Sequence, residues 1–280
     1  MDSFLFDNGS LQPEPCRQLR CIAKQLSERV GQTITPVSLL HSSTVDPVLL
    51  DGKPAMLLET ALRDRLAQGK RRFLLQPLFI GPSLALTNYL PQRLGALRKQ
   101  YPDMQASLAS CLVPSEPREQ IAVVELLYKN VQTVIQQQQL DQPAVVLVDH
   151  GTPVPAVNAV RNQLAAQLAS YLGEYISRLA PASMERRPGK AFAFNEPLLS
   201  CLLDTPEYCN GPVIVALLFL LPGRHAGQGG DIAEICRVAE MRHPGLQTYC
   251  TSPLGEHLGL VPILEQRFYQ GLHEFSHAVA

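Results

Sequence analysis

Two halves of the chain carry matching turn-forming residues at a constant offset of 142 residues. The clearest match joins the segment DNGS at 7–10 to the segment DHGT at 149–152. Further matches at the same offset are Gly31 and Gly173, Gly69 and Gly211, and Pro102 and Pro244. Because glycine and proline mark turns, a constant offset between them predicts the same order and length of elements in both halves. The chain is therefore expected to contain a duplicated fold.

Each half contains four short apolar runs that alternate with amphipathic stretches, a pattern typical of βαβ units in a parallel sheet. We predict an α/β protein of two tandem flavodoxin-like domains, residues 1–140 and 141–280, each with a mainly four-stranded parallel sheet flanked by helices. The polar tract 136–143 is expected to end the last helix of the first domain and to link the two domains. The expected strands lie near 4–6, 34–40, 73–79, 105–109, 144–148, 176–183, 213–221 and 247–251, and the expected helices of the second half near 157–172, 198–203, 231–242 and from 260 onward.

Composition and charge exclude several classes of function. A net charge of −1, from 24 basic and 25 acidic residues, gives no field for nucleic acid or an anionic membrane. The longest apolar run, 213–221, is too short to span a bilayer, and the first residues lack the features of a signal peptide, so a cytoplasmic protein is expected. Seven cysteines without C-x-x-C spacing argue against a disulfide framework or a zinc ribbon. The chain also has no Walker loop and no G-x-S-x-G elbow, which disfavours nucleotide-dependent and serine-hydrolase functions.

Two histidines of the second half directly follow predicted strands. His150 precedes Gly151 and Thr152 in a tight strand-to-helix turn, and His225 precedes a glycine-rich segment that leads to Asp231, the expected N-cap of the next helix. Ligands of open parallel sheets bind beyond the carboxyl ends of the strands. Imidazole ligates late first-row divalent metals and, when neutral, accepts protons. Taken together, His150 and His225 are candidate metal ligands and catalytic bases, although a single loop histidine is more often solvated.

The repeat offers a comparison for this pair. The positions that match His150 and His225 in the first half are Asn8 and, depending on a two-residue gap, Ser83 or Ala85. The first domain therefore lacks both histidines. This asymmetry is expected when one copy of a duplicated domain keeps the chemistry and the other degenerates.

Other polar residues lie at the same predicted sheet edge. Glu185 follows the second strand of its half and is a candidate carboxylate, with His41 as its approximate counterpart in the first half. Arg186, Arg187 and Arg224 could bind substrate carboxylates through their forks of donors, together with the backbone N–H groups of Gly151 and Thr152. A solvated ion pair for Glu185 and scattered surface arginines are the alternative interpretations.

The second half resembles the sirohydrochlorin chelatase family, the two-domain class II chelatases that insert iron or cobalt into a precursor of siroheme or cobalamin without ATP. The segments that carry the resemblance are, in order, 149–153 with Asn158, 194–197, 217–225 with Asp231 and Ile232, and 252–257. In this family the histidines after the first and third strands handle the metal, and these fall on His150 and His225. The family's carboxylate after the second strand falls on Glu185, and the loop from His225 to Asp231 is two residues longer than usual.

The resemblance implies insertion of Fe²⁺ or Co²⁺ into sirohydrochlorin or a related tetrapyrrole, with no cofactor beyond the metal substrate. His150 and His225 would bind the metal and accept pyrrole protons, assisted by Glu185. Two rival functions stay open. The first is a carrier that binds metal or tetrapyrrole without turnover, and the second is a two-domain receptor for a small polar ligand. The metal preference, the tetrapyrrole, the oligomeric state and the roles of Glu185 and His41 are left open by the sequence.

Overall fold

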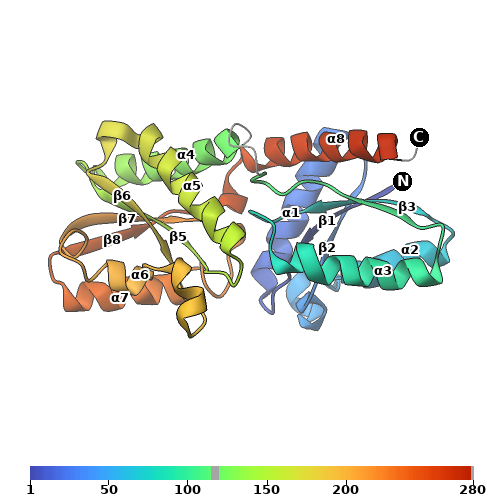
Figure 1. Ribbon diagram of the computed structural model, residues 1–280, viewed down its shortest axis with the longest axis horizontal. Coiled ribbons are helices and arrows are strands. Elements are labelled where there is room, and N and C mark those ends of the chain that lie inside the picture. The colour runs from blue at the N-terminus through green and yellow to red at the C-terminus, as the bar shows by residue number, and fades with distance from the viewer. Residues whose placement is uncertain (115–119, 279–280) are drawn as a thin grey trace. The chain divides into compact units, whose positions relative to one another are not determined.

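Two four-stranded parallel sheets with the same strand order form the centre of the fold, with the orders β2-β1-β3-β4 and β6-β5-β7-β8. A computed structural model describes residues 1–114 and 120–278, and Figure 1 shows each sheet with helices on both of its faces. The predicted α/β class is therefore confirmed. The strands are β1 Asp2–Asp7, β2 Ile34–Ser38, β3 Arg72–Pro77, β4 Gln105–Leu108, β5 Ala144–Asp149, β6 Arg178–Ser183, β7 Gly211–Leu217 and β8 Leu246–Cys250. The α-helices are α1 Pro13–Val30, α2 Leu58–Ala67, α3 Leu90–Gln100, α4 Ile121–Gln138, α5 Pro155–Leu172, α6 Leu199–Leu202, α7 Asp231–Arg242 and α8 Leu260–Ala278.

The repeat is visible in the backbone as well as in the sequence. Strands β1 and β5 and helices α1 and α5 begin and end exactly one repeat apart, and each of the two helices has proline in its first turn. Proline suits this place because its fixed φ fits the helix and its missing N–H has no intrahelical partner there. Gly31 and Gly173 follow the two helices with φ values of 68° and 50°, a backbone region that glycine enters without strain.

The chain divides into two compact units, Met1–Ser115 with Gly259–Ala280, and Glu116–Leu258. They are called unit 1 and unit 2 below. The boundary differs from the expected division at 140/141. The tract 136–143 does end a helix, since Gln139 closes α4 in the left-handed conformation, but this helix belongs to unit 2. The predicted linker is therefore an internal turn of unit 2.

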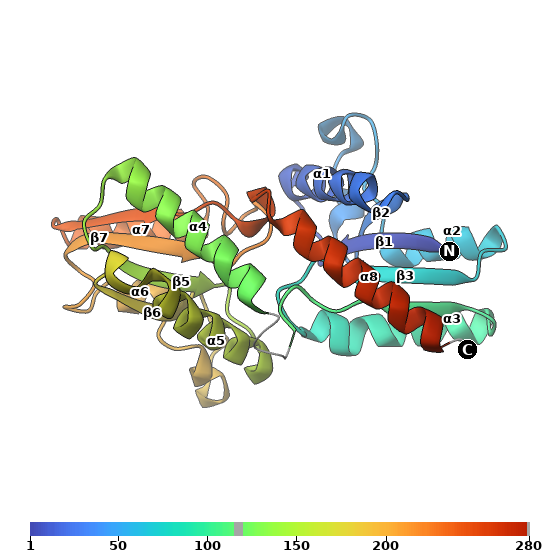
Figure 2. The same ribbon diagram turned by 90° about the horizontal axis from the view of Figure 1, so that it is seen from above.

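The difference arises because the last helix of each predicted domain packs on the sheet of the other predicted domain. Helix α4 packs on α5 and β7 in unit 2, and α8 packs on α1, β3 and β4 in unit 1. Figure 2 shows α8, in red, running along the first sheet, and α4, in green, beside α5. Both helices have an apolar side, and that of α4 buries residues such as Val124 and Leu127. Burial of that side is the main stabilisation available to an amphipathic helix.

The central strands are buried on both faces, as expected for parallel sheets covered by helices. All six residues of β5 and five of the six residues of β1 are buried. In unit 2, α4 and α5 lie on one face of the sheet and α6 and α7 on the other (Figure 1). In the part of the chain that the structure describes, no helix combines the length and the apolar character needed to cross a membrane.

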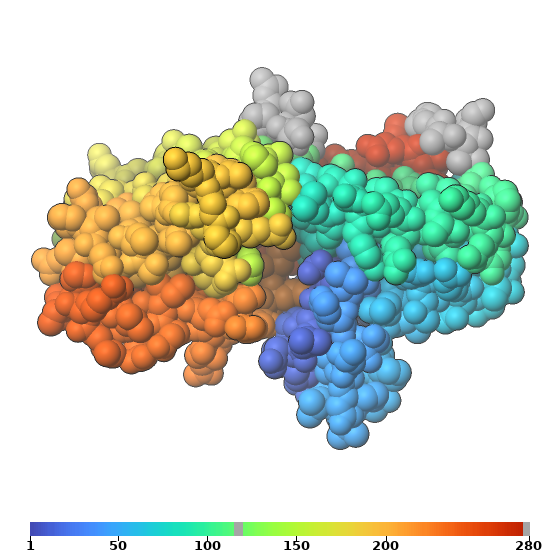
Figure 3. Space-filling model, turned by 60° about the horizontal axis from the view of Figure 1, so that its bottom comes forward, coloured from blue at the N-terminus to red at the C-terminus, as the bar shows by residue number. Residues whose placement is uncertain are grey.

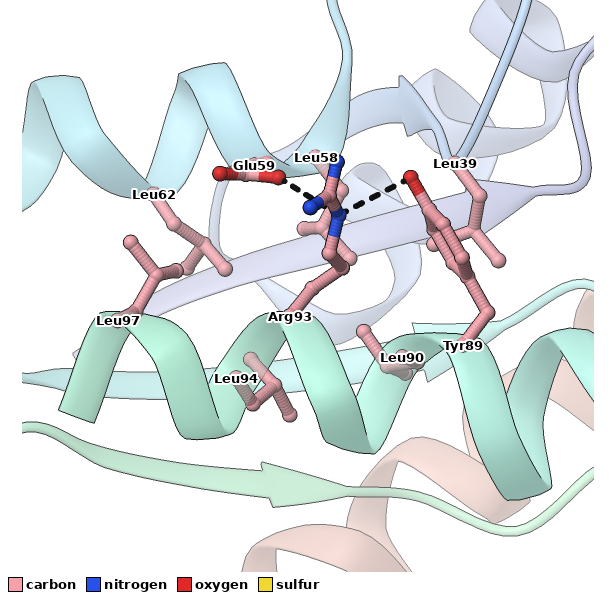
Figure 4. A pocket seen from close by; sticks show the side chains of 9 residues that line it. All are labelled: Leu39, Leu58, Glu59, Leu62, Tyr89, Leu90, Arg93, Leu94 and Leu97. Atoms are coloured by element: carbon pink, nitrogen blue, oxygen red, sulfur yellow. Dashed lines mark hydrogen bonds and ion pairs between the residues drawn. The ribbon is translucent and has the colours of Figure 1, made fainter. Parts of the chain in front are cut away.

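Polar side chains close the outer layer of unit 1. Between α2 and α3 lies a leucine-lined cavity of about 10 Å³, and Arg93 spans it to reach Glu59 at 3.1 Å and the Tyr89 hydroxyl at 3.3 Å (Figure 4). This space holds about one water molecule and is too small for a ligand.

The blue segment containing Pro47–Leu50 stands out from the surface of the unit in Figure 3, and Arg20 holds it by donating to the Leu50 and Lys53 carbonyls.

A buried aspartate ends the first strand of each unit, but its partners differ. Asp149 Oδ1 accepts a hydrogen bond from Ser183 Oγ at 2.7 Å and lies 3.5 Å from Nη1 of Arg161. The residue one repeat before Arg161 is Leu19, so Asp7 has no arginine at this place. Burial raises the pKa of Asp7 from 3.8 to about 6, against the opposing hydrogen bond from Ser38. Ionised Asp7 therefore costs unit 1 stability at neutral pH.

Replacing Asp7 with Asn should stabilise unit 1 in a pH-dependent way. Because the folded-state pKa of Asp7 is raised, the penalty is absent below pH 4 and complete above about pH 6. D7N should therefore raise the free energy of unfolding by up to about 3 kcal/mol at pH 8 and change it little at pH 4. Urea unfolding at the two pH values measures this difference. D149N is the matched control and should destabilise the protein, since it leaves the Arg161 charge buried without a carboxylate. A D7N gain that is equal at both pH values would contradict the assignment.

Candidate active site

His150 and His225 meet at the carboxyl edge of the second sheet. His150 directly follows β5, and His225 lies in the loop between β7 and α7. Strands β5 and β7 are neighbours in the sheet, so their carboxyl ends deliver both residues to one place. The two imidazole rings lie 4.6 Å apart between centroids, with their planes at 76°. The structure therefore brings together the two histidines that the sequence singled out.

Each of the two rings has a hydrogen-bond partner at Nδ1. Nδ1 of His225 lies 2.6 Å from Asp231 Oδ2, and Nδ1 of His150 lies 3.2 Å from the carbonyl oxygen of Gly151. Because both partners are acceptors, they are satisfied by the tautomer that carries its proton on Nδ1, and in that tautomer the Nε2 lone pair can bind a metal or take a proton. A carboxylate behind a ligating histidine is a common arrangement in metal sites.

Glu185 completes the polar group around the histidines. Its Oε1 lies 3.6 Å from Nε2 of His150, and its side chain is mostly exposed. The backbone fixes this approach, because the Glu185 N–H donates to the His150 carbonyl at 3.2 Å. Gly151 has φ of 92°, and a Cβ atom there would lie 1.9 Å from the Glu185 carbonyl oxygen. Only glycine lets the turn carrying His150 pass so close to the strand end carrying Glu185.

The counterpart of Glu185 in unit 1 is Leu40, not His41. The Leu40 N–H donates to the Asn8 carbonyl at 3.1 Å, as that of Glu185 does to His150. A Cβ atom at Gly9 would lie 1.7 Å from the Leu40 carbonyl oxygen, which repeats the close approach at Gly151. The expected match to His41 is therefore wrong by one residue.

The backbone N–H groups of Gly151 and Thr152 are used within the protein. That of Gly151 donates to Asp149 Oδ1 at 3.1 Å, and that of Thr152 donates to Asn195 Oδ1 at 2.9 Å. The Asn195 amide also donates to the Thr152 carbonyl at 2.9 Å. These two residues were expected to bind substrate through their N–H groups, but those donors already have partners and serve instead to fix the turn.

The three expected substrate-binding arginines have different surroundings. Arg224 is 77% exposed beside the histidine pair, with Nε 3.5 Å from Asp231 Oδ2. Arg186 forms an ion pair with Glu196 at 2.5 Å, and Arg187 lies over the Phe192 ring at 5.8 Å. Both of these contacts stay within the loop after β6. Arg224 is therefore the arginine best placed to meet a carboxylate near His225.

Asp231 is a site residue that sequence reasoning placed in a different role. It was expected to cap α7, but Gly230 occupies the N-cap position and Asp231 is the first residue of the helix. Its carboxylate instead accepts from His225. The loop 218–230 between β7 and α7 is longer than the corresponding loop 78–84 of unit 1, and its glycines let it fold back so that residues six apart meet. The signal available in the sequence was the acidic residue that follows His225 across a glycine-rich loop.

A cavity of about 340 Å³ opens beside the His225 loop. Its apolar wall includes Leu217 and Ile232, and its polar wall includes Thr251 and Glu256. This volume is at the lower end of the range for small-molecule sites. Within residues 1–114 and 120–278, no three or more histidine, cysteine, aspartate or glutamate side chains form a group that could hold a metal ion. The site therefore offers a pair of imidazoles with Glu185 against one of them.

Unit 1 has a hollow of about 400 Å³ at the matching sheet edge, but its chemistry is different. Leu78 and Leu218 occupy equivalent places at the ends of their strands, because the N–H of Leu78 donates to the Phe6 carbonyl and that of Leu218 to the Val148 carbonyl. The residues that line the hollow carry no imidazole, thiol or carboxylate; they are Asn8, Leu40, Leu84, Ala85, Asn88, Tyr89 and Gln92. The structure thus agrees with Asn8 as the counterpart of His150, while Ser83 or Ala85 stays the predicted counterpart of His225.

Comparison with known proteins agrees with this description. Residues 144–271 match the CbiX family. This stretch, a little less than half of the chain, is similar to the CbiX family. The match confirms the family resemblance of the second half, and it includes both histidines, Glu185 and Asp231. A search of curated proteins found no match to the sequence.

Three solved structures share the fold of this chain. SirB from Bacillus subtilis with Fe³⁺ has a TM-score of 0.66 at 14% identity, with 98% of this chain and 96% of that chain covered. SirB from Bacillus subtilis subspecies spizizenii, a sirohydrochlorin chelatase in complex with cobalt, has a TM-score of 0.65 at 14% identity, with 99% and 96% covered. DR2241 from Deinococcus radiodurans, a multi-domain protein similar to chelatases, has a TM-score of 0.60 at 15% identity, with 94% and 53% covered. At these identities the likeness establishes the fold of the whole chain.

Replacing Asp231 with Asn should weaken metal binding through His225. The substitution removes the carboxylate that orients the ring and favours the tautomer with a free Nε2, and such changes typically cost 10- to 100-fold in metal affinity. Titration with Co²⁺, followed by visible absorption, measures the affinity. D204N is the matched control, because Asp204 accepts from His243 Nε2 at 2.9 Å in a similar pair outside the site. Equal Co²⁺ affinities for D231N and D204N would contradict the role given to Asp231.

Proposed function

We propose that this protein inserts a divalent metal, Fe²⁺ or Co²⁺, into sirohydrochlorin without consuming a nucleotide. The observation that carries the proposal is the meeting of two imidazoles at one sheet edge, each hydrogen-bonded within the protein through Nδ1. Both are suitable ligands for either metal. The CbiX family match and the fold shared with SirB support the same reaction.

Metal insertion requires two kinds of chemistry, and the site supplies residues for both. As a divalent ion enters the macrocycle, two pyrrole N–H protons leave and four nitrogens replace the earlier ligands of the ion. Nε2 of His150 and of His225 would hold the ion before transfer and accept protons when the ion departs. Glu185, 3.6 Å from Nε2 of His150, would receive a proton from that ring and pass it to solvent through its exposed carboxylate.

The charge around the site suits a substrate with carboxylate arms. Arg224 is exposed next to the histidine pair and can form paired hydrogen bonds with a carboxylate. Its only described ion pair, with Asp231, is long at 3.5 Å and leaves donors for substrate. The cavity beside the His225 loop offers apolar surface to part of the macrocycle. We place the reaction in the synthesis of siroheme or cobalamin.

Replacing both histidines should abolish enzyme-dependent insertion. H150A and H225A should each lower kcat/KM for sirohydrochlorin by at least about 10²-fold, because each removes a ligand and a base. The spectral change of sirohydrochlorin on metallation measures the rate with Fe²⁺ and with Co²⁺. H243A, which removes a histidine outside the site, should match the unsubstituted protein.

The same assay separates the enzyme from a carrier. A carrier would bind metal or tetrapyrrole stoichiometrically and leave the insertion rate at the uncatalysed value. Multiple turnovers per protein molecule support the enzyme, whereas undiminished catalysis by the H150A/H225A double variant would contradict the site assignment.

A further inference from the structure

Arg161 is a buried arginine that contacts the strand ends next to the candidate active site. It projects from α5, and it is 1% exposed. Its Nη1 reaches Ser183 Oγ at 2.5 Å, the Asn195 carbonyl at 3.3 Å and Asp149 Oδ1 at 3.5 Å. Its other two nitrogens donate to Asn162 Oδ1 at 3.1 and 3.0 Å. Burying a guanidinium is costly unless its donors are satisfied, and here all three nitrogens have partners.

These contacts join three segments that form the site. Asp149 ends β5, next to His150, and Ser183 ends β6, two residues before Glu185. Asn195 ends the loop that follows Glu185, and both its main chain and its side chain are used. The Asn195 carbonyl accepts a hydrogen bond from Arg161. The Asn195 side-chain amide accepts from the Thr152 N–H and donates to the Thr152 carbonyl. Arg161 is therefore connected through Asn195 to the turn that carries His150.

Unit 1 shows that the turn alone does not need an arginine. Leu19 occupies the place of Arg161, yet Gly9 has φ of 95°, close to the 92° of Gly151. The Ser10 N–H donates to Ser42 Oγ at 3.0 Å, much as the Thr152 N–H donates to Asn195. An arginine is thus not required to form the turn in the unit that lacks the histidines. The arginine is present in the unit whose loop after the second strand carries the candidate site residue Glu185.

We propose that Arg161 is a positioning residue that anchors the loop 186–195 against the His150 turn and so keeps Glu185 facing Nε2 of His150. It acts through Asn195 and does not touch substrate. The inference rests on the proposed function for its kinetic consequence, but the anchoring itself is a property of the fold. The alternative role is neutralisation of the Asp149 charge. Unit 1 folds without such neutralisation, because Leu19 stands at the position of Arg161 and leaves Asp7 without an arginine.

A pair of variants distinguishes anchoring from neutralisation. R161L copies the residue of unit 1 but leaves Asp149 buried without its arginine. D149N/R161L removes both charges, and the Asn side chain keeps an oxygen to accept from Ser183 and Gly151. R237L is the control, because Arg237 is an exposed arginine of α7 that pairs with Glu234 in the same helix. If R161L folds poorly, the neutral double variant carries the test.

Amide hydrogen exchange on the full chain gives the first readout. Anchoring predicts that D149N/R161L exchanges the Thr152 amide and the amides of 186–195 at least about 10-fold faster, while β5 and β7 keep their protection. Exchange at the rate of the unsubstituted protein in these segments would overturn the proposal. R237L should leave the exchange of these amides unchanged.

Kinetics of Co²⁺ insertion into sirohydrochlorin give the second readout. A displaced Glu185 should lower kcat about 10- to 100-fold in D149N/R161L, with KM for Co²⁺ changed less than about threefold. Recovery of kcat in the double variant relative to R161L would overturn the proposal, because neutralisation would then be the whole role. If the unsubstituted protein inserts no metal, the proposed function fails, and amide exchange alone still decides whether Arg161 anchors the loop.

Discussion

The pairing of β5 with β7 is the constraint on which the site depends. Parallel neighbours end at the same edge of a sheet, so the residues that follow them meet although they are far apart in sequence. His150 and His225 are brought together in this way, and the loop that returns from His225 to Asp231 then sets the ring. A close approach at Gly151, which excludes any Cβ atom, places Glu185 against the first histidine. Each of these features is local, and the sheet makes them converge.

Comparison of the two units shows which parts of the edge belong to the fold and which to the chemistry. Both units have the same strand order, the same glycine turn and a buried aspartate at the end of the first strand. Unit 2 adds the histidines, a longer loop before α7 and an arginine beneath the aspartate. In unit 1 the aspartate has no arginine, and its pKa is raised to about 6. The duplicated fold thus supplies the turn, while a few substitutions supply the charges and ligands.

Much of this arrangement could be predicted from the sequence because its signals are local. Apolar runs bounded by glycine and proline located the strands, and strand ends located His150 and His225. The packing of α4 in unit 2 and of α8 in unit 1 could not be predicted, since an amphipathic pattern shows which side of a helix is buried but not which sheet covers it. The hydrogen bonds of Asn195 and Asp231 could not be predicted either, because they join residues across loops whose path depends on tertiary packing. The sequence also does not show that Arg186 pairs with Glu196 and that Arg187 lies over the Phe192 ring, so substrate binding by these two residues stays a prediction.

The most direct test of the account is X-ray absorption at the cobalt edge of the Co²⁺-loaded protein. Scattering from imidazole rings reports how many histidines bind the metal, and sulfur ligands are distinguished by their longer bonds. The account predicts two imidazoles per metal in the unsubstituted protein, one in H150A or H225A, and none in the double variant. Sulfur ligation, or an imidazole count that stays at two in the double variant, would contradict the claim that this histidine pair carries the metal.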